Sequence, residues 1–210
     1  MIDGGSMSED RQIVFISAIL LAAGQATRMG ELKQLLPFRG KTLVEWALAP
    51  LLHPAVSEVI AVVGYRAEEV QKILAAYPVK IVLNEQFVEG MGSSIQRGLQ
   101  EISPRARAVL IGLADQPGIS TEVVTMLIAA FGSTEKRIII PVSAGRRGHP
   151  VLFDLSLKAE MLAASKEVGL RQVLRAHPEE ILEVPVEGEG ILLDVDTPEE
   201  YRRLLQPPQT

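Results

Sequence analysis

Short apolar stretches alternate with segments of helical periodicity over most of the chain, and this alternation limits the folds that it can adopt. The apolar stretches lack a polar face, which is typical of parallel strands buried on both sides of a sheet. They are Ile13–Leu20, Val59–Val63, Val79–Leu83, Ala108–Leu113 and Ile138–Val142. Helices are predicted over Thr42–Leu52, Ala67–Ala76, Ser93–Ile102 and Ser120–Phe131. The alternation predicts a doubly wound, three-layer α/β fold with a mostly parallel sheet, whose ligands bind at the carboxyl ends of the strands.

The pattern becomes less regular after Pro150. We expect helices near Leu155–Ala164 and Leu170–Ala176, a strand at Ile181–Val186 and a last helix that begins at Thr197. A length of 210 residues suits one domain, for which we expect the bounds 13–205. We expect residues 1–12 to be disordered or foreign to the native protein, which can begin at Met7, and residues 206–210 to form a frayed tail.

Composition narrows the class of protein. Apolar residues make up 47% of the chain, yet they form no run near the roughly 20 residues that a membrane helix needs. The first ten residues are polar and acidic, and the sequence has no cysteine. We therefore expect a cytoplasmic protein without disulfides, thiolate metal sites or a membrane partner. The net charge of −5 argues against a nucleic-acid partner, so any anion site has to be local.

The loop Leu21–Lys33 follows the first predicted strand and has the residue types that bind a triphosphate. Its small residues Ala22, Ala23 and Gly24 let the backbone approach a ligand closely and leave N–H groups free for phosphate oxygens. Arg28 and Lys33 add two positive charges. The spacing fits neither a Walker loop nor a dinucleotide fingerprint. Five residues separate Gly24 from Gly30, Glu31 follows Gly30, and Ala26 stands two positions after Gly24.

Asp115 directly follows the predicted strand Ala108–Leu113, next to Ala114. A carboxylate at the end of a parallel strand lies in the ligand crevice, and Mg²⁺ is usually held by one or two carboxylates together with substrate phosphate. Asp196 precedes the sequence Thr197–Glu200, which has the pattern of a helix start: Thr as the cap, Pro next and Glu three positions after the cap. By itself this pattern explains an acidic residue here without any catalytic role.

Two further loops are rich in glycine. The segment Asn84–Ser94 enters a helix through two glycines and two serines, and capping by Ser93 or Ser94 explains it by itself. In the segment Gly145–Pro150, two arginines stand between glycines and form an anion-binding hook. The chain's three histidines lack the spacing of a zinc site.

These motifs, taken in order, resemble the molybdenum-cofactor nucleotidyltransferases of the nucleotide-diphospho-sugar transferase superfamily, and most of all the molybdopterin cytidylyltransferase type. The resemblance covers nearly the whole chain after Ile13. Leu21 departs from the threonine typical of the cytidylyl type, and Ala26 departs from its serine. The motifs are Ala22–Gly24, Arg28–Gly30, Lys33, Leu36–Gly40, Asn84–Gly98, Asp115–Pro117, Gly148–Pro150 and Asp194–Pro198.

The resemblance implies transfer of CMP from CTP to the terminal phosphate of molybdopterin, with release of pyrophosphate and with Mg²⁺ or Mn²⁺ as the cofactor. It implies a molybdoenzyme of the xanthine or aldehyde dehydrogenase type as the recipient of the product. It assigns catalysis to Arg28 and Lys33, metal binding to Asp115 and Asp196, and acceptor binding to Arg146, Arg147 and His149. The nucleotide-binding residues that it implies are Leu21, Ala22, Ala23, Gly24, Arg28, Lys33, Gly90, Ser94 and Asp115.

Three alternatives stay open at this point. The first is another substrate, GTP or a sugar phosphate, although guanylyl-type relatives usually have Ala-Gly-Gly where this chain has Ala22-Ala23-Gly24. The second is a non-catalytic chaperone for the molybdenum cofactor. The third is a reductase, because some similar proteins are described as oxidoreductases, but the missing dinucleotide fingerprint argues against it.

Overall fold

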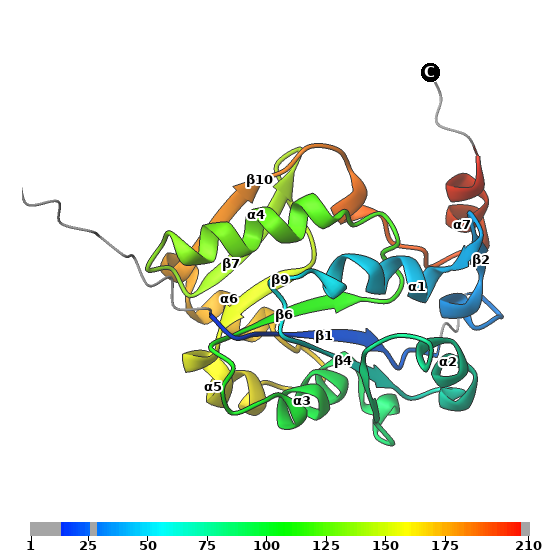
Figure 1. The fold of residues 1–210 in the computed structure, drawn as a ribbon, viewed down its shortest axis with the longest axis horizontal. Coiled ribbons are helices and arrows are strands. Elements are labelled where there is room, and N and C mark those ends of the chain that lie inside the picture. The colour runs from blue at the N-terminus through cyan, green and yellow to red at the C-terminus, as the bar shows by residue number, and fades with distance from the viewer. Residues whose placement is uncertain (1–13, 26–28, 207–210) are drawn as a thin grey trace, which may run out of the picture.

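The computed structural model describes residues 14–25 and 29–206, and these form an eight-stranded mixed sheet covered by helices on both faces (Figure 1). The strand order is β10-β7-β9-β6-β1-β4-β5. The short strand β8 pairs with the last two residues of β7, Val142 and Ser143. The strands are β1 (Ile16–Ala22), β4 (Glu58–Val63), β5 (Lys80–Leu83), β6 (Ala108–Leu113), β7 (Ile138–Ser143), β8 (Arg146–Arg147), β9 (Val151–Asp154) and β10 (Ile181–Pro185). The pairs that involve β8 or β9 are antiparallel and the others are parallel, which confirms the predicted fold class.

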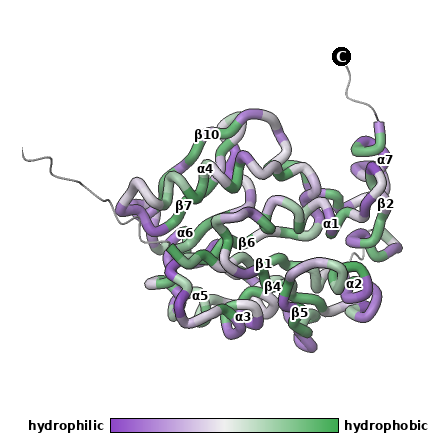
Figure 2. The backbone as a smooth tube through the Cα atoms, viewed as in Figure 1, coloured by the Kyte–Doolittle hydropathy of each residue, from purple (hydrophilic) through white to green (hydrophobic). Residues whose placement is uncertain are grey.

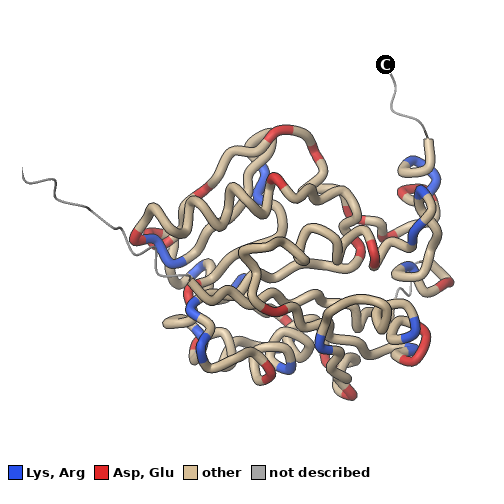
Figure 3. Tube along the Cα trace, viewed as in Figure 1, with Lys and Arg blue, Asp and Glu red and all other residues tan. Residues whose placement is uncertain are grey.

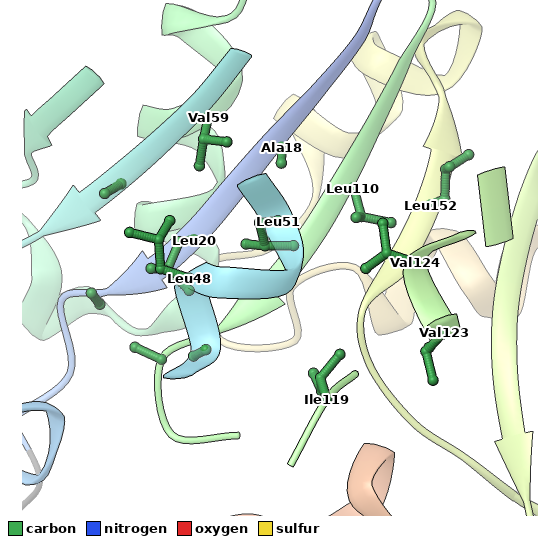
Figure 4. Close-up of a cluster of buried hydrophobic side chains, with 14 of the residues drawn as sticks. Ala18, Leu20, Leu48, Leu51, Val59, Leu110, Ile119, Val123, Val124 and Leu152 are labelled. Atoms are coloured by element: carbon green, nitrogen blue, oxygen red, sulfur yellow. The ribbon is translucent and has the colours of Figure 1, made fainter. Parts of the chain in front are cut away.

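The central strand β1 is buried along its whole length because both of its faces are covered. Alternate side chains point to opposite faces of a strand, so Ala18 and Leu20 pack in one apolar cluster while Ile19 and Leu21 pack in another. Helices α1 (Leu43–Leu48), α2 (Ala67–Leu74) and α4 (Thr121–Gly132) cover the first face; α3 (Met91–Glu101), α5 (Lys158–Ala163) and α6 (Arg171–Ala176) cover the second. Figure 4 shows the first cluster, in which Leu48 of α1 lies beside Leu20 of β1, and Val124 of α4 lies beside Leu110 of β6. In Figure 2, β1 and β4 appear as a hydrophobic centre.

Strand β9 is a feature that the sequence pattern did not predict. It runs antiparallel between β6 and β7, with Ile111 paired to Val151 and Ile138 paired to Phe153. The strand has four residues, and its apolar stretch Val151–Phe153 is too short to be distinguished from a buried loop by periodicity. Its insertion separates β6 from β7, yet both of these strands still end at the same edge of the sheet.

A small third apolar cluster lies outside the main layers and joins the chain's last helix to an early hairpin. The hairpin consists of β2 (Pro37–Phe38) and β3 (Lys41–Thr42), and the helix is α7 (Pro198–Leu205). Phe38 and Val195 are buried in this cluster, and Tyr201 packs against it. The Tyr201 hydroxyl also donates a hydrogen bond to the Pro37 carbonyl oxygen at 2.5 Å. This docking brings the segment before α7 close to the segment before the hairpin.

Across residues 14–25 and 29–206, none of the helices combines the length and the apolar content that crossing a membrane requires.

Candidate active site

Several predicted site residues lie at the carboxyl edge of the parallel strands. Leu21 of β1 is paired with Leu113 of β6, and the Ala114 N–H donates to the Leu21 carbonyl oxygen at 3.1 Å. The loop that begins at Ala23 and the loop that holds Asp115 therefore leave the sheet side by side. The crevice at strand ends is where open α/β sheets bind their ligands.

Lys33 connects two carboxylates that are distant in sequence. It lies in the 3-10 helix η1 (Lys33–Leu35) and is only 8% exposed. Its Nζ lies 2.6 Å from Asp115 Oδ2 and 2.6 Å from Asp196 Oδ1. We call these three residues the Lys33 cluster. The arrangement brings together three of the residues that the sequence assigned to catalysis and metal binding.

The charge of Lys33 survives its burial. Burial lowers the pKa of this ammonium, but the charges and hydrogen bonds of Asp115 and Asp196 raise it by more. The net effect is a pKa above the ordinary value of 10.5. Lys33 is therefore a cation at neutral pH, as a group that binds phosphate has to be.

Close backbone contacts bring the Asp196 segment to this edge. The Val195 N–H donates to the Asp115 carbonyl oxygen at 3.0 Å. Just before it, Gly118 and Gly190 touch through their backbones, and a Cβ atom at Gly190 would lie 2.1 Å from the Gly118 carbonyl oxygen. The segment can approach this closely only because both positions lack a side chain.

The backbone before α7 has the predicted helix start, and Asp196 also joins the cluster. The Glu200 carboxylate accepts hydrogen bonds from the N–H groups of Asp196 at 2.8 Å and Thr197 at 2.9 Å. The Thr197 hydroxyl accepts from the Glu200 N–H at 3.2 Å, which completes a capping box. Glu200 thus satisfies the backbone of this segment, and the Asp196 side chain contacts Lys33.

Asp194 and His149 lie next to the Lys33 cluster, and the charges of its aspartates affect the pKa of both side chains. Asp194 Oδ1 accepts a hydrogen bond from Gln116 Nε2 at 2.6 Å. Burial raises the pKa of Asp194; the hydrogen bond from Gln116 opposes this rise, while Asp115 and Asp196 add to it. Burial lowers the pKa of His149 below 6.5, although Asp194 and Asp115 act in the opposite direction. His149 is therefore an uncharged imidazole at neutral pH.

The two arginines of the predicted acceptor loop form β8 and are exposed. They follow the carboxyl end of β7, which is the edge of the sheet that the sequence predicted for them. The Arg147 guanidinium Nε lies 2.7 Å from Glu183 Oε1 on the outermost strand β10. Among the described residues, no contact joins Arg146 or Arg147 to Lys33 or Asp115. Arg171, at the start of α6, acts on the His149 charge and was not singled out from the sequence.

The predicted nucleobase loop is held closed by its own polar groups. Asn84 Nδ2 donates to the hydroxyl oxygens of Ser93 at 2.9 Å and Ser94 at 3.0 Å, and all three residues are buried. Gly90 occupies the cap position of α3, and neither serine does, so the capping explanation for these serines was wrong. Ser93 instead donates to the carbonyl oxygens of Gln86 at 2.9 Å and Gly90 at 2.8 Å, which fixes the loop's shape.

Gln34 was not recognised from the sequence, although it directly follows Lys33. It is 2% exposed, and its Nε2 donates to the Gly24 carbonyl oxygen at 3.0 Å. This bond ties the small-residue loop after β1 to the segment that carries Lys33. Leu21, Ala22 and Ala23 are buried beside it. Arg28 lies outside the described residues.

The donor groups of the Lys33 cluster suit a divalent cation that also binds substrate phosphate. Asp115 Oδ1 is buried and, among the described residues, has no hydrogen-bond partner. Two carboxylates that share one cation can also share another, and hard cations such as Mg²⁺ and Mn²⁺ prefer oxygen ligands. Within the described part of the chain, no group of three or more His, Asp or Glu side chains could hold a metal by itself. Phosphate and water would therefore have to complete the coordination.

An open α/β sheet with a cation and paired carboxylates at its strand ends is typical of proteins that bind nucleotides or other phosphates. Acidic and basic positions are interspersed along the chain (Figure 3). A model of the MobA-like NTP transferase domain matches residues 18–181. The chain therefore belongs to this family of nucleotidyltransferases, which confirms the family predicted from the sequence motifs.

The most informative relatives differ in the activities for which they are named. The chain is 34% identical over 208 residues to the nicotine blue oxidoreductase of Paenarthrobacter nicotinovorans, a match that covers 93% of this chain and 99% of the relative. It is 25% identical over 187 residues to the molybdenum cofactor cytidylyltransferase of Escherichia coli K12, covering 89% and 93%. The solved structure of Rv0371c from Mycobacterium tuberculosis H37Rv is 28% identical, with a TM-score of 0.81 and coverage of 92% and 98%. Rv0371c has also been solved as a manganese complex.

Proposed function

We propose that this protein transfers CMP from CTP to the terminal phosphate of molybdopterin and releases pyrophosphate. The observation that carries the proposal is the Lys33 cluster, in which one buried cation and two carboxylates meet at the strand ends. The similarity to a molybdenum cofactor cytidylyltransferase supports the acceptor, and the Ala22-Ala23-Gly24 sequence supports cytidine over guanosine.

The residues of this chain would position the two substrates and neutralise charge, and none of them has to act as a general base. A phosphate monoester has its second pKa near ~6 and is mostly ionised at neutral pH, so its oxygen can attack the α-phosphorus of CTP without a general base. The new P–O bond forms as the bond between the α-phosphorus and pyrophosphate breaks. Lys33, together with Arg28, would neutralise the charge that builds up on the departing pyrophosphate. His149 would contact the acceptor as a neutral imidazole, without adding a positive charge to the site.

The remaining assignments follow from position at the same edge. Asp115 and Asp196 would hold Mg²⁺ or Mn²⁺, which supplies positive charge to the triphosphate oxygens when it is bound. Gly90 and Ser94 would contact the base and ribose from the loop that Asn84 closes. Arg146 and Arg147 would bind the acceptor's phosphate, and the product would pass to a molybdoenzyme of the xanthine or aldehyde dehydrogenase type.

Pyrophosphate release with molybdopterin and each of the four nucleoside triphosphates tests the proposal. We expect release with CTP, little with the other nucleotides, and none without a divalent cation. Release with GTP alone would transfer the assignment to the guanylyl type. Nucleotide binding without release for any nucleotide would instead indicate a chaperone that carries the molybdenum cofactor.

A reductase is the second candidate, because a relative at 34% identity is named as an oxidoreductase. The loop after β1 lacks the glycine spacing that holds a dinucleotide. Titration with NADH and NADPH separates the two candidates, since the nucleotidyltransferase assignment predicts no saturable binding of either dinucleotide.

A further inference from the structure

Two aromatic side chains lie at the carboxyl edge of the sheet, near the loop after β1. Tyr65 follows β4, and Phe87 begins the 3-10 helix η3 (Phe87–Glu89) after β5. Strands β1, β4 and β5 are parallel neighbours, so the loops that follow them leave the sheet side by side. The two ring centroids are 6.2 Å apart and the ring planes are inclined by 58°, a geometry in which aromatic rings attract each other. We call these two residues the aromatic pair.

The aromatic pair adjoins both loops to which nucleotide contacts are assigned. The Tyr65 N–H donates to the Ala23 carbonyl oxygen at 3.2 Å. Between the two loops lies Gly64, where a Cβ atom would be 2.8 Å from Ala23 Cβ and 2.8 Å from Phe87 Cβ. The three loops can approach this closely only because position 64 has no side chain. Phe87 is also part of the segment that leads to Gly90, the residue assigned to the base and ribose.

Core packing does not account for the aromatic pair. Aromatic residues make up only 4% of the chain. Among the described residues, the three apolar clusters include neither Tyr65 nor Phe87. Tyr65 is 36% exposed and Phe87 is half-buried. Rings held at a ligand-binding edge and left partly open offer an apolar surface to a flat ligand, and every nucleobase has a flat π face.

We propose that the aromatic pair is the surface on which the base of the substrate nucleotide stacks. The base lies flat on the more exposed ring, that of Tyr65, and meets the ring of Phe87 at its edge, because the two rings are inclined to each other. This proposal deepens the proposed function and rests on it for the nucleotide. Stacking tolerates any base, so the pair supplies affinity that all four nucleotides share. The choice between cytosine and guanine is a separate property, for which Ala23 is the proposed determinant.

Calorimetric titration of CTP and of inorganic triphosphate, each with Mg²⁺ and without acceptor, tests the proposal. We expect Tyr65→Leu and Phe87→Leu to raise the dissociation constant of CTP at least about fivefold, because each removes a ring and keeps an apolar side chain. The dissociation constant of inorganic triphosphate should not change, since this ligand has no base. Tyr65→Phe keeps the ring and should bind CTP like the wild type. Met126→Ala is the control, because Met126 is 40% exposed and lies on α4, outside the three loops.

Proton magnetic resonance of bound CTP distinguishes stacking from a role in loop structure. A base that lies on an aromatic ring has its protons shifted upfield by the ring current. We expect this shift for the cytosine protons at saturating CTP in the wild type and in Tyr65→Phe, and its loss in Tyr65→Leu. Melting temperatures without ligand check that each variant is folded. Since Tyr65 is exposed, Tyr65→Leu carries the test if Phe87→Leu is unstable.

Unchanged CTP affinity in both leucine variants would overturn the proposal. An equal loss of affinity for CTP and inorganic triphosphate would also overturn it, because the effect would then come from a disturbed loop. Titration with GTP separates the proposal from the proposed function. A wild type that prefers GTP, together with a similar loss of GTP affinity in Tyr65→Leu, would contradict CMP transfer and still support stacking. A wild type that binds CTP and retains that affinity without the rings would overturn stacking alone.

Discussion

At the scale of single residues, the site depends on neutralising charge in a place with little water. Lys33 is nearly buried, which costs free energy for an ammonium unless opposite charge is close. Asp115 and Asp196 meet that requirement, and their side chains stay partly exposed toward the crevice. The buried Lys33 ammonium therefore depends on both carboxylates, and removing either one leaves it with less opposite charge.

The two aspartates should respond differently to substitution. We expect Asp115→Asn to lower metal-dependent turnover by at least about 100-fold, since it removes a charge placed for the transition state. Asp196→Asn should do the same, and the melting temperature should fall only because Lys33 loses one of its two carboxylates, since the capping box formed by Thr197 and Glu200 remains. Turnover measured against Mg²⁺ concentration, together with thermal unfolding, checks both expectations. Asp194→Asn is the control, since that carboxylate contacts Gln116 and not Lys33. A stable Asp196→Asn protein with unchanged Mg²⁺ dependence would exclude Asp196 from the metal site.

At the scale of elements, most helices begin within one residue of the predicted start, and a capping residue also joins distant segments. Glu45 accepts hydrogen bonds from the Thr42 N–H at 2.7 Å and from the Thr42 hydroxyl at 2.7 Å, which starts α1. Its other oxygen accepts from the Tyr77 hydroxyl at 2.6 Å, beyond the end of α2. One carboxylate thus fixes the start of α1 against a neighbouring helix on the same face of the sheet.

This role of Glu45 makes stability depend on pH. Burial raises the pKa of Glu45, but the hydrogen bonds from Tyr77 and Thr42 lower it by more, so its pKa in the folded protein lies below 4.5. A lowered carboxylate pKa stabilises the fold above the unfolded-state value, and this contribution is lost as the pH falls through the folded-state value. We expect Glu45→Gln to lower the free energy of unfolding by about 1 kcal/mol at pH 7. The difference in the free energy of unfolding between Glu45→Gln and the wild type, measured by urea titration, should become smaller toward pH 3. Glu68→Gln, on the exposed side of α2, should show no such trend.

The parallel strands and their helices could be predicted because their signal is local. Each of the strands β1, β4 and β6 is a nearly continuous apolar run, and the helices α1, α4 and α7 begin at the local capping residues Thr42, Ser120 and Thr197. Strand β9 could not be predicted, because a four-residue apolar stretch becomes a strand only through its neighbours β6 and β7. The roles of Gln34 and Asn84 also depend on partners elsewhere in the chain, and a buried amide has no periodic pattern that marks it in a sequence.

At the scale of the whole molecule, one edge of the sheet gathers segments from the entire sequence. The loops after β1, β6 and β7 lie there because these strands are mutually parallel. Lys33 and Asp115 could be predicted from their positions near strand ends. The contact between Lys33 and Asp196 could not, because it depends on how α7 docks onto the β2–β3 hairpin.

The nucleotide that the protein prefers should raise its melting temperature more than the other nucleotides do. A ligand that binds only the folded state stabilises it, and at 100 times its dissociation constant this amounts to about 2.7 kcal/mol. For a domain of this size the melting temperature should rise by roughly 5–10 °C. We expect CTP with Mg²⁺ to raise it more than GTP, ATP or UTP, because Ala23 replaces the glycine of guanylyl-type relatives. Thermal unfolding with each nucleotide measures this, and Ala23→Gly is the matched variant, which should narrow the gap between CTP and GTP. Equal shifts for CTP and GTP in the wild type would contradict the cytidine assignment.

The docking of α7 also has a consequence for protein synthesis. Lys33 and Asp196 are 163 residues apart, so a ribosome has translated nearly all of the sheet before the second carboxylate of the cluster exists. A nascent chain can build the β1–β4–β6 centre early, since those strands precede Asp196 by many residues. Until Tyr201 reaches the hairpin, Lys33 has at most one of its two carboxylate partners. The Lys33 cluster is therefore complete only after every strand of the sheet has been translated.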